Sequence, residues 1–147
     1  MNPIPIRKLH PDAILPARAS AGAAGYDLSA RLDAPLTLAP MRRAGVPTGL
    51  AMAIPAGYAG FVFARSGLGL RAGISLPNGV GVIDSDYRGE VVVALVNLGD
   101  APYTVHPGDR IAQLVISPVA VPDFWEAPEL PATARGEGGF GSTGIRS

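Results

Sequence analysis

The sequence predicts an all-β fold of the sandwich, jelly-roll or barrel type, and three observations support this. The 19 glycines and 15 prolines are spread along almost the whole chain of 147 residues. No window of about a dozen residues has an apolar repeat of 3.6 residues that is free of glycine and proline. Short apolar runs alternate instead with turn residues, which is the pattern of many short strands joined by loops.

The apolar runs give the expected strands, and turn segments such as Pro11-Asp12 and Asp33-Ala-Pro35 separate them. The one expected helix is short, from Ser66 to Ala72, because its glycines limit it to a turn or two. The expected strands are Ile4–Leu9, Tyr26–Leu32, Leu36–Leu38, Gly49–Ile54, Tyr58–Ala64, Val80–Ile83, Val91–Leu98, Tyr103–Val105 and Ile111–Val119.

The length fits one domain that buries a substantial core. We expect a β core in residues 1–121 and a C-terminal arm in residues 122–147, because Pro122, Pro128 and Pro131 interrupt the chain there. Half of the residues from Arg135 to Gly144 are glycine, so this segment either stays mobile or becomes ordered on a ligand.

The composition excludes several classes of function. Twelve basic and twelve acidic residues give a net charge of zero, so neither nucleic acid nor an anionic membrane is an expected partner. The chain has no cysteine and only His10 and His106, which leaves no disulfide framework, thiolate site or histidine cage. No signal-peptide core and no run of about 20 apolar residues is present, so a cytoplasmic protein is expected.

The run from Val91 to Leu98 is apolar on both faces of a strand and is broken only by Asn97. A strand of this kind is buried on both faces. In an all-β domain of this size, one face could lie against another subunit. The run therefore hints at an oligomer.

The stretch from Asn78 to Glu90 holds the most concentrated set of reactive side chains. The apolar runs before and after it predict a β-hairpin whose tip carries two carboxylates, a tyrosine and an arginine. Taken singly, Asp84 and Asp86 are better explained as turn formers, and Tyr87 is better explained as a packing residue than as a ligand contact.

Other segments carry polar groups whose individual meaning is open. Asp27 near a strand start is by itself an ordinary turn residue, and Arg65-Ser66-Gly67 at a strand end suits either an anion or a plain loop. Gln113 stands among apolar residues and needs a hydrogen-bond partner, which can be structural. The segment Arg135–Thr143 is either a disordered tail or an arm in which glycine amides, an arginine and Phe140 close over a nucleotide.

Together these five segments resemble, in order and spacing, the five motifs of the trimeric dUTP pyrophosphatase (dUTPase) family. The resemblance runs from about Leu9 to the end of the chain. It implies a jelly-roll-like β fold, a homotrimer with shared active sites, a tail that caps a neighbour's site, Mg²⁺, and the products dUMP and pyrophosphate. The segments are Ala24–Ala30, Ala64–Leu68, Asn78–Gly89, Gly108–Leu114 and Arg135–Gly144.

The resemblance also implies a role for each matching residue. Asp84 resembles the carboxylate that activates the attacking water, Asn78 and the backbone of Val82, Ile83 and Asp84 resemble the uracil reader, and Tyr87 resembles the residue under the deoxyribose. Arg65, Ser66 and Gly67 would hold the α- and β-phosphates, and Gln113 would help to place phosphate or water. Asp27 would hold waters of the magnesium ion, and Arg135, Phe140, Gly141, Ser142 and Thr143 would cap the base and the γ-phosphate.

Two alternatives share this general pattern. A dCTP deaminase of the same fold needs a glutamate on the strand that follows the stretch from Asn78 to Glu90. At that position this chain has Ala94, and no carboxylate lies between Val91 and Asn97. A non-catalytic deoxynucleotide-binding relative is the other, and the retained Asp84 and complete tail argue against it.

Overall fold

The computed structural model describes residues 3–139, and within them the chain forms eleven strands and one short helix. The expectation of a mainly β protein with one short helix is confirmed. The elements are β1 Ile6–Lys8, β2 Tyr26–Ser29, β3 Leu36–Leu38, β4 Arg43–Pro47, β5 Leu50–Met52, β6 Tyr58–Ala64, α1 Ser66–Ala72, β7 Ile74–Ser75, β8 Gly81–Ile83, β9 Val92–Asn97, β10 Tyr103–Val105 and β11 Arg110–Pro118.

Two of the strands, β4 and β7, are missing from the sequence-based expectation. β4 contains Gly45 and Pro47, which indicate a turn when they are read locally. It is an edge strand beside β9, where a proline is tolerated because one side of the strand needs no ladder bonds. A Cβ added at Gly45 would lie 3.0 Å from Cγ1 of Val92, so the glycine allows the close packing of this pair.

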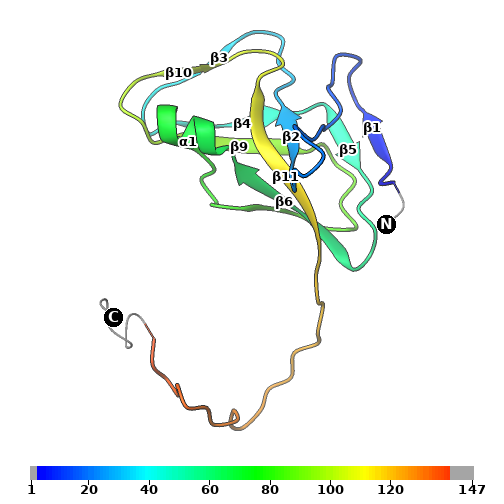
Figure 1. Ribbon diagram of the computed structural model, residues 1–147, viewed down its shortest axis with the longest axis vertical. Helices are drawn as coiled ribbons and strands as arrows, with labels where there is room; N and C mark the ends of the chain where they lie inside the picture. The colour runs from blue at the N-terminus through cyan, green and yellow to red at the C-terminus, as the bar shows by residue number, and fades with distance from the viewer. Residues whose placement is uncertain (1–2, 140–147) are drawn as a thin grey trace.

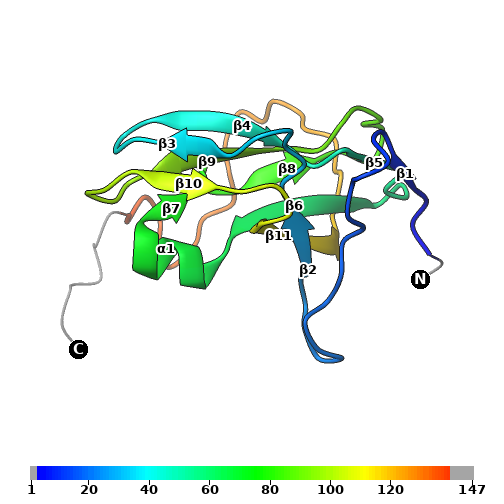
Figure 2. The ribbon, with the colours of Figure 1, turned by 90° about the horizontal axis from the view of Figure 1, so that it is seen from above.

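The larger sheets form two layers that share one apolar core. One sheet has the order β2-β11-β6-β8 and the other β4-β9-β7, and every ladder is antiparallel. Figure 2 shows β4 and β9 above β6 and β11. Leu28, Val62 and Leu114 of the first sheet belong to the same buried cluster as Val46 and Val93 of the second. Such face-to-face packing is typical of β-sandwiches and jelly rolls. In the described residues the strands form four separate sheets and no closed barrel.

The expected hairpin between Val80 and Val96 is wrong. β8 pairs with β6, whereas β9 pairs with β4 and β7, so the two strands belong to different sheets. The backbone of Val91 is bonded to the β4–β5 turn instead, because its N–H donates to Leu50 O at 2.8 Å and its C=O accepts from Thr48 N at 3.2 Å. Residues 78–90 therefore cross from one layer to the other.

Asn97 ties β9 to its surroundings through three side-chain hydrogen bonds. Its side chain is fully buried. Nδ2 donates to the carbonyls of Leu38 and Ala101 at 2.8 Å each, and Oδ1 accepts from the amide of Gly99 at 2.9 Å. The one polar residue of the apolar strand is thus a structural residue.

Replacing Asn97 with alanine is expected to destabilise the fold by roughly 3 kcal/mol, since each buried group that loses its partner costs about 1–3 kcal/mol. Urea unfolding measures the loss. The matched control is Leu98→Ala, because this neighbouring side chain is half-exposed and its removal should change the free energy of unfolding by at most about 0.5 kcal/mol. Equal losses for the two variants would contradict the structural role of the amide.

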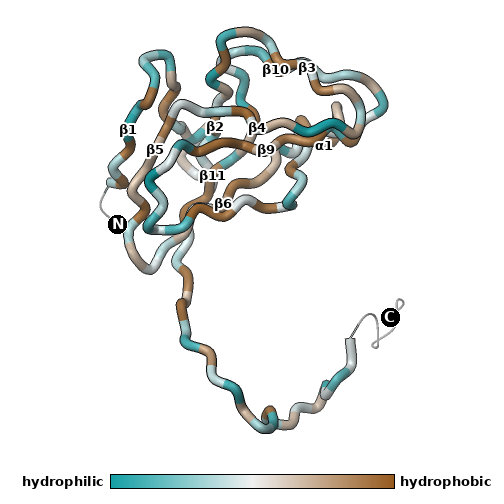
Figure 3. The backbone as a smooth tube through the Cα atoms, turned by 180° about the vertical axis from the view of Figure 1, so that it is seen from behind, coloured by the Kyte–Doolittle hydropathy of each residue, from teal (hydrophilic) through white to brown (hydrophobic). Residues whose placement is uncertain are grey.

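After β11 the chain leaves the body of the molecule. Residues 119–139 form no regular element and extend away from the sheets (Figure 1). Apolar stretches recur along this segment in Figure 3. The large apolar side chains of this segment that are exposed in the single chain are Val121, Phe124, Trp125 and Leu130. None of the helices described is long and apolar enough to cross a membrane.

Candidate active site

A cavity of about 280 Å³ lies between the two layers, and most of its lining residues fall within residues 78–94. Asn78, Val82, Ile83, Asp84 and Tyr87 all line it, so five of the predicted substrate-binding residues share one site. β8 presents Val82 and Ile83 to the cavity, and its register is set by the pairing of Val82 with Phe61 of β6. The opposite wall comes from Glu90 and the first residues of β9.

The loop from Asp84 to Glu90 is braced by its own hydrogen bonds. The amide of Tyr87 donates to Asp84 O at 3.2 Å, which closes a turn. Nη1 of Arg88 donates to the carbonyls of Ser85 and Tyr87 at 2.7 and 2.8 Å. These bonds hold Asp84 at the cavity, with its side chain exposed to solvent.

Tyr87 is held at both its ring and its hydroxyl. The hydroxyl donates to the backbone carbonyl of Glu90 at 2.9 Å. A Cβ added at Gly89 would lie 2.6 Å from Cζ of Tyr87, so the ring packs directly against this glycine. The side chain nevertheless keeps 46% of its surface exposed, which leaves a free aromatic face for a ligand.

A second polar group is built around the carboxylate of Asp27 on β2. Oδ1 accepts from Nε of Arg65 at 3.1 Å, and Oδ2 accepts from Nη1 of Arg110 at 3.0 Å. Nη1 of Arg65 also donates to the carbonyl of Arg110 at 3.2 Å. The Asp27 side chain is only 11% exposed, so this ionic cluster is preorganised on the ends of β6 and β11.

Gln113 and Tyr103 lie near this ionic cluster. Gln113 is paired in register with Asp27, and a Cβ at Gly25 would lie 3.2 Å from its Oε1. Burial raises the pKa of the Tyr103 phenol, the negative charge of Asp109 raises it further, and Arg65 opposes the shift. The phenol therefore stays neutral at neutral pH.

No separate role is predicted from the sequence for Arg110 or Glu90, which the structure places beside the predicted site residues. Arg110 pairs with a carboxylate 83 positions away, so no local pattern marks it. Its only signal is its position at the start of a long strand within the segment Gly108–Leu114. Glu90 is the last residue of the stretch from Asn78 to Glu90, and its side chain reaches the β4–β5 turn.

Within one chain the cavity and the ionic cluster are apart. β8 and β2 are the outer strands of the four-stranded sheet, with β11 and β6 between them. Ser66 and Gly67 begin α1 beside the cluster, where first-turn amides have no acceptor within a helix. Arg135 lies on the extended arm, and its Nε donates to Gly138 O at 2.7 Å. Phe140, Gly141, Ser142 and Thr143 lie outside the described residues.

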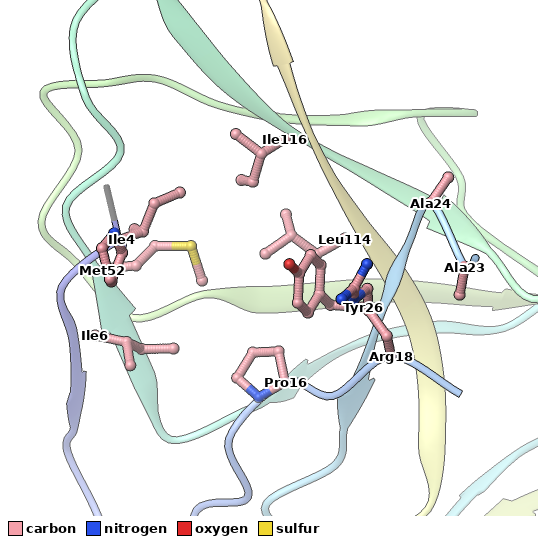
Figure 4. Close-up of a pocket in the computed structure, with 11 residues that line it drawn as sticks. Ile4, Ile6, Pro16, Arg18, Ala23, Ala24, Tyr26, Met52, Leu114 and Ile116 are labelled. Atoms are coloured by element: carbon pink, nitrogen blue, oxygen red, sulfur yellow. The ribbon is translucent and has the colours of Figure 1, made fainter. Parts of the chain in front are cut away.

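A larger cavity of about 640 Å³ lies beside β1 and β11. Figure 4 shows Ile4, Ile6, Met52 and Leu114 around it, from several different strands. Its one charged lining residue is Arg18, whose guanidinium lies 5.8 Å from the centre of the Tyr26 ring. This lining has no carboxylate, and its polar side chains are those of Arg18 and Tyr26, so it is a mainly apolar groove and not the candidate reaction site.

The dUTPase family model matches residues 11–144. Deoxyuridine 5'-triphosphate nucleotidohydrolase of Desulfitobacterium hafniense (strain DSM 10664 / DCB-2) is 56% identical over 132 residues, which cover 89% of this chain and 87% of the relative. The enzyme of the same name from Syntrophotalea carbinolica is 51% identical over 142 residues, 97% of each chain.

Solved structures give the same result. A mutant dUTPase of Staphylococcus bacteriophage 80alpha with dUpNHpp has a TM-score of 0.90 and 28% identity, covering 99% of this chain and 100% of that one. A mutant dUTPase of S. aureus phage phi11, described for its coordination of a structural Mg(II) ion, has a TM-score of 0.79 and 27% identity, covering 87% of this chain and 98% of that one. The chain belongs to the dUTPase family.

Proposed function

We propose that this protein hydrolyses dUTP to dUMP and pyrophosphate through attack of water on the α-phosphate, with Mg²⁺ bound to the substrate. This would remove dUTP and supply dUMP for thymidylate synthesis. Membership of the dUTPase family supports the substrate class. The observation that carries the proposal is the cavity lined together by Asn78, Asp84 and Tyr87, because it joins a base-sized space, a carboxylate and an aromatic face.

The backbone of β8 is suited to reading uracil. Among the strands of residues 3–139, β8 is the outer strand of its sheet and pairs only with β6, so the N–H and C=O groups on its other edge have no partner in those strands. Val82, Ile83 and Asp84 line the cavity together with Asn78. Backbone donors and acceptors at fixed spacing match the edge of uracil, and a narrow cavity excludes the methyl group of thymine.

We assign the chemical step to Asp84 and the contact with the sugar to Tyr87. In our proposal the Asp84 carboxylate takes a proton from the attacking water, and the Tyr87 ring lies under the deoxyribose, where a 2′-hydroxyl would collide with it. A carboxylate is a weak base in water, since its reference pKa is about 3.9. A closed site that excludes solvent strengthens its interaction with the bound water.

The triphosphate is assigned to Arg65, Ser66 and Gly67, with Gln113 placing phosphate or water. Both carboxylate oxygens of Asp27 accept hydrogen bonds from arginines, and the bond from Arg65 holds the guanidinium of that residue in place. The remaining lone pairs of the Asp27 carboxylate can accept from a water bound to magnesium. Magnesium commonly binds through substrate phosphates and water with only one or two carboxylates, which fits this donor set. When bound, it supplies positive charge against the phosphates.

The separation of the cavity from the ionic cluster supports active sites shared between subunits. We propose a homotrimer in which residues 122–147 form an arm that caps a neighbouring core of residues 1–121. Arg135, Phe140, Gly141, Ser142 and Thr143 would cover the base and the γ-phosphate there. Val92 and Ala94 are exposed on β9 in the single chain and offer a subunit contact. A cytoplasmic location stays a prediction.

The two alternatives make different products. A dCTP deaminase would need a glutamate at the cavity wall, where Ala94 stands. A non-catalytic relative would bind deoxynucleotides without turnover, and the cavity position of Asp84 favours the enzyme instead.

A product assay with dUTP, dTTP, dCTP and UTP tests the proposal. We expect magnesium-dependent release of pyrophosphate from dUTP and rates at least about 10²-fold lower for the other three nucleotides. The site must reject the methyl group of thymine in dTTP, the amino group of cytosine in dCTP and the 2′-hydroxyl of the ribose in UTP. Conversion of dCTP to dUTP would support the deaminase alternative, and equal rates for dUTP and dTTP would contradict base reading by β8.

A further inference from the structure

Glu90 connects the wall of the cavity to the core of the protein. Its side chain is partly buried and lines the cavity beside Tyr87. Its Oε1 accepts a hydrogen bond from the amide of Gly49 at 2.7 Å. Gly49 is itself buried in the turn between β4 and β5, so the Glu90 carboxylate provides the hydrogen-bond acceptor that this buried N–H group needs.

Gly49 is a fixed anchor for this bond. Its φ of +69° is in the left-handed region, and a Cβ there would lie 2.8 Å from Cβ of Ala13. Its carbonyl accepts from the amide of Leu9 at 2.8 Å. Since the position is restricted to glycine and held on its other side, its N–H points in a defined direction.

Glu90 links Gly49 to the aromatic ring of Tyr87. The backbone carbonyl of Glu90 accepts from the Tyr87 hydroxyl at 2.9 Å. Gly89 packs against the same ring, where a side chain with a Cβ would collide with it. The hydroxyl of Tyr87 is thus bonded to the residue whose side chain is bonded to the core.

We propose that Glu90 is a positioning residue that fixes Tyr87 and thereby sets the preference for a deoxyribose over a ribose. The proposal rests on the proposed function, in which the Tyr87 ring lies under the sugar. Rejection of a 2′-hydroxyl requires that the ring does not yield, and a displacement of about 1 Å at a reacting site costs up to roughly 100-fold in rate. The bond to Gly49 supplies this rigidity.

Two substitutions at Glu90 separate positioning from charge. Glu90→Gln keeps an Oε1 acceptor for the amide of Gly49, whereas Glu90→Ala removes it. We expect Glu90→Ala to raise KM for dUTP and to lower the ratio of kcat/KM for dUTP over UTP by about 10-fold, a part of the full effect of misplacement. Glu90→Gln should keep this ratio within about 3-fold of wild type, as the neutral amide preserves the acceptor.

Thr48→Val is the matched control for stability. Oγ1 of Thr48 donates to the carbonyl of Val91 at 2.6 Å, next to Glu90, whereas the Tyr87 hydroxyl donates to the carbonyl of Glu90 itself. Loss of this hydrogen bond in Thr48→Val should lower the Tm of the protein and leave the ratio of kcat/KM for dUTP over UTP unchanged. Hydrogen exchange of the Gly49 amide should accelerate in Glu90→Ala and stay near the wild-type rate in Glu90→Gln.

The possible outcomes separate the positioning role from the proposed function. An unchanged dUTP/UTP ratio in Glu90→Ala, despite faster exchange at Gly49, would make Glu90 merely structural and overturn the proposal. The same losses in Glu90→Gln and Glu90→Ala would overturn it too, because the charge would then matter instead of the acceptor. Tyr87→Ala tests the proposed function separately: a wild-type ratio in that variant would refute the sugar contact itself.

Discussion

Replacing Asp84 with asparagine is expected to lower kcat for dUTP by roughly 10² to 10⁴-fold, the usual contribution of a general base. Binding of dUTP should stay near the wild-type level, because the asparagine has the same shape and the backbone of β8 is unchanged. Single-turnover kinetics and equilibrium binding of a non-hydrolysable dUTP analogue measure the two effects separately.

Asp86→Asn is the matched control for this substitution. Asp86 has the same chemistry, lies two residues away in the same exposed loop, and is absent from the lining of the cavity. Its replacement should leave kcat within about 3-fold of wild type, as expected for a surface change away from the site. Wild-type turnover in Asp84→Asn, or equal losses in both variants, would refute the assignment of Asp84 as the base.

Much of the fold was predictable because local patterns carry the information for it. Tyr58–Ala64 and Tyr103–Val105 were expected with their observed bounds, since apolar runs between turn residues favour strands. Ser66–Ala72 was likewise the expected helix. In the site, Asn78, Asp84 and Tyr87 were expected together because they are neighbours in sequence, and they line one cavity.

What was missed depends on long-range pairing. β8 and β9 looked like a hairpin because they are close in sequence, but the backbone of Val91 bonds to Thr48 and Leu50 across the molecule. Arg110 acquires its place only when β11 packs beside β2 and meets Asp27. Such contacts are decided by the register of distant strands, which local propensity does not specify.

Deleting residues 135–147 is expected to leave a folded core and to lower kcat for dUTP by about 10³-fold. That figure is the low end of the effect of an arginine supplied to a transferring phosphate, the role that we propose for Arg135. The core should be unaffected because residues 119–134 run outside the sheets and Arg135 is exposed (Figure 1). Urea unfolding, light scattering and steady-state kinetics measure stability, assembly and turnover.

A chain that lacks only Arg146 and Ser147 is the control, since it keeps the whole glycine-rich segment and should retain wild-type turnover. Loss of the oligomer in the longer deletion would instead make the arm a structural element. Unchanged turnover would remove it from the active site.

Mixing two inactive chains shows which subunit the arm serves. The deletion variant keeps Asp84 and lacks the arm, whereas full-length Asp84→Asn keeps the arm and lacks the base. If the arm caps a neighbour, co-refolded oligomers contain sites in which an intact Asp84 meets an intact arm, and activity returns. If the arm folds back onto its own chain, every site lacks one of the two groups and the mixture stays inactive. Recovery on mixing therefore distinguishes a shared site from a site built within one chain.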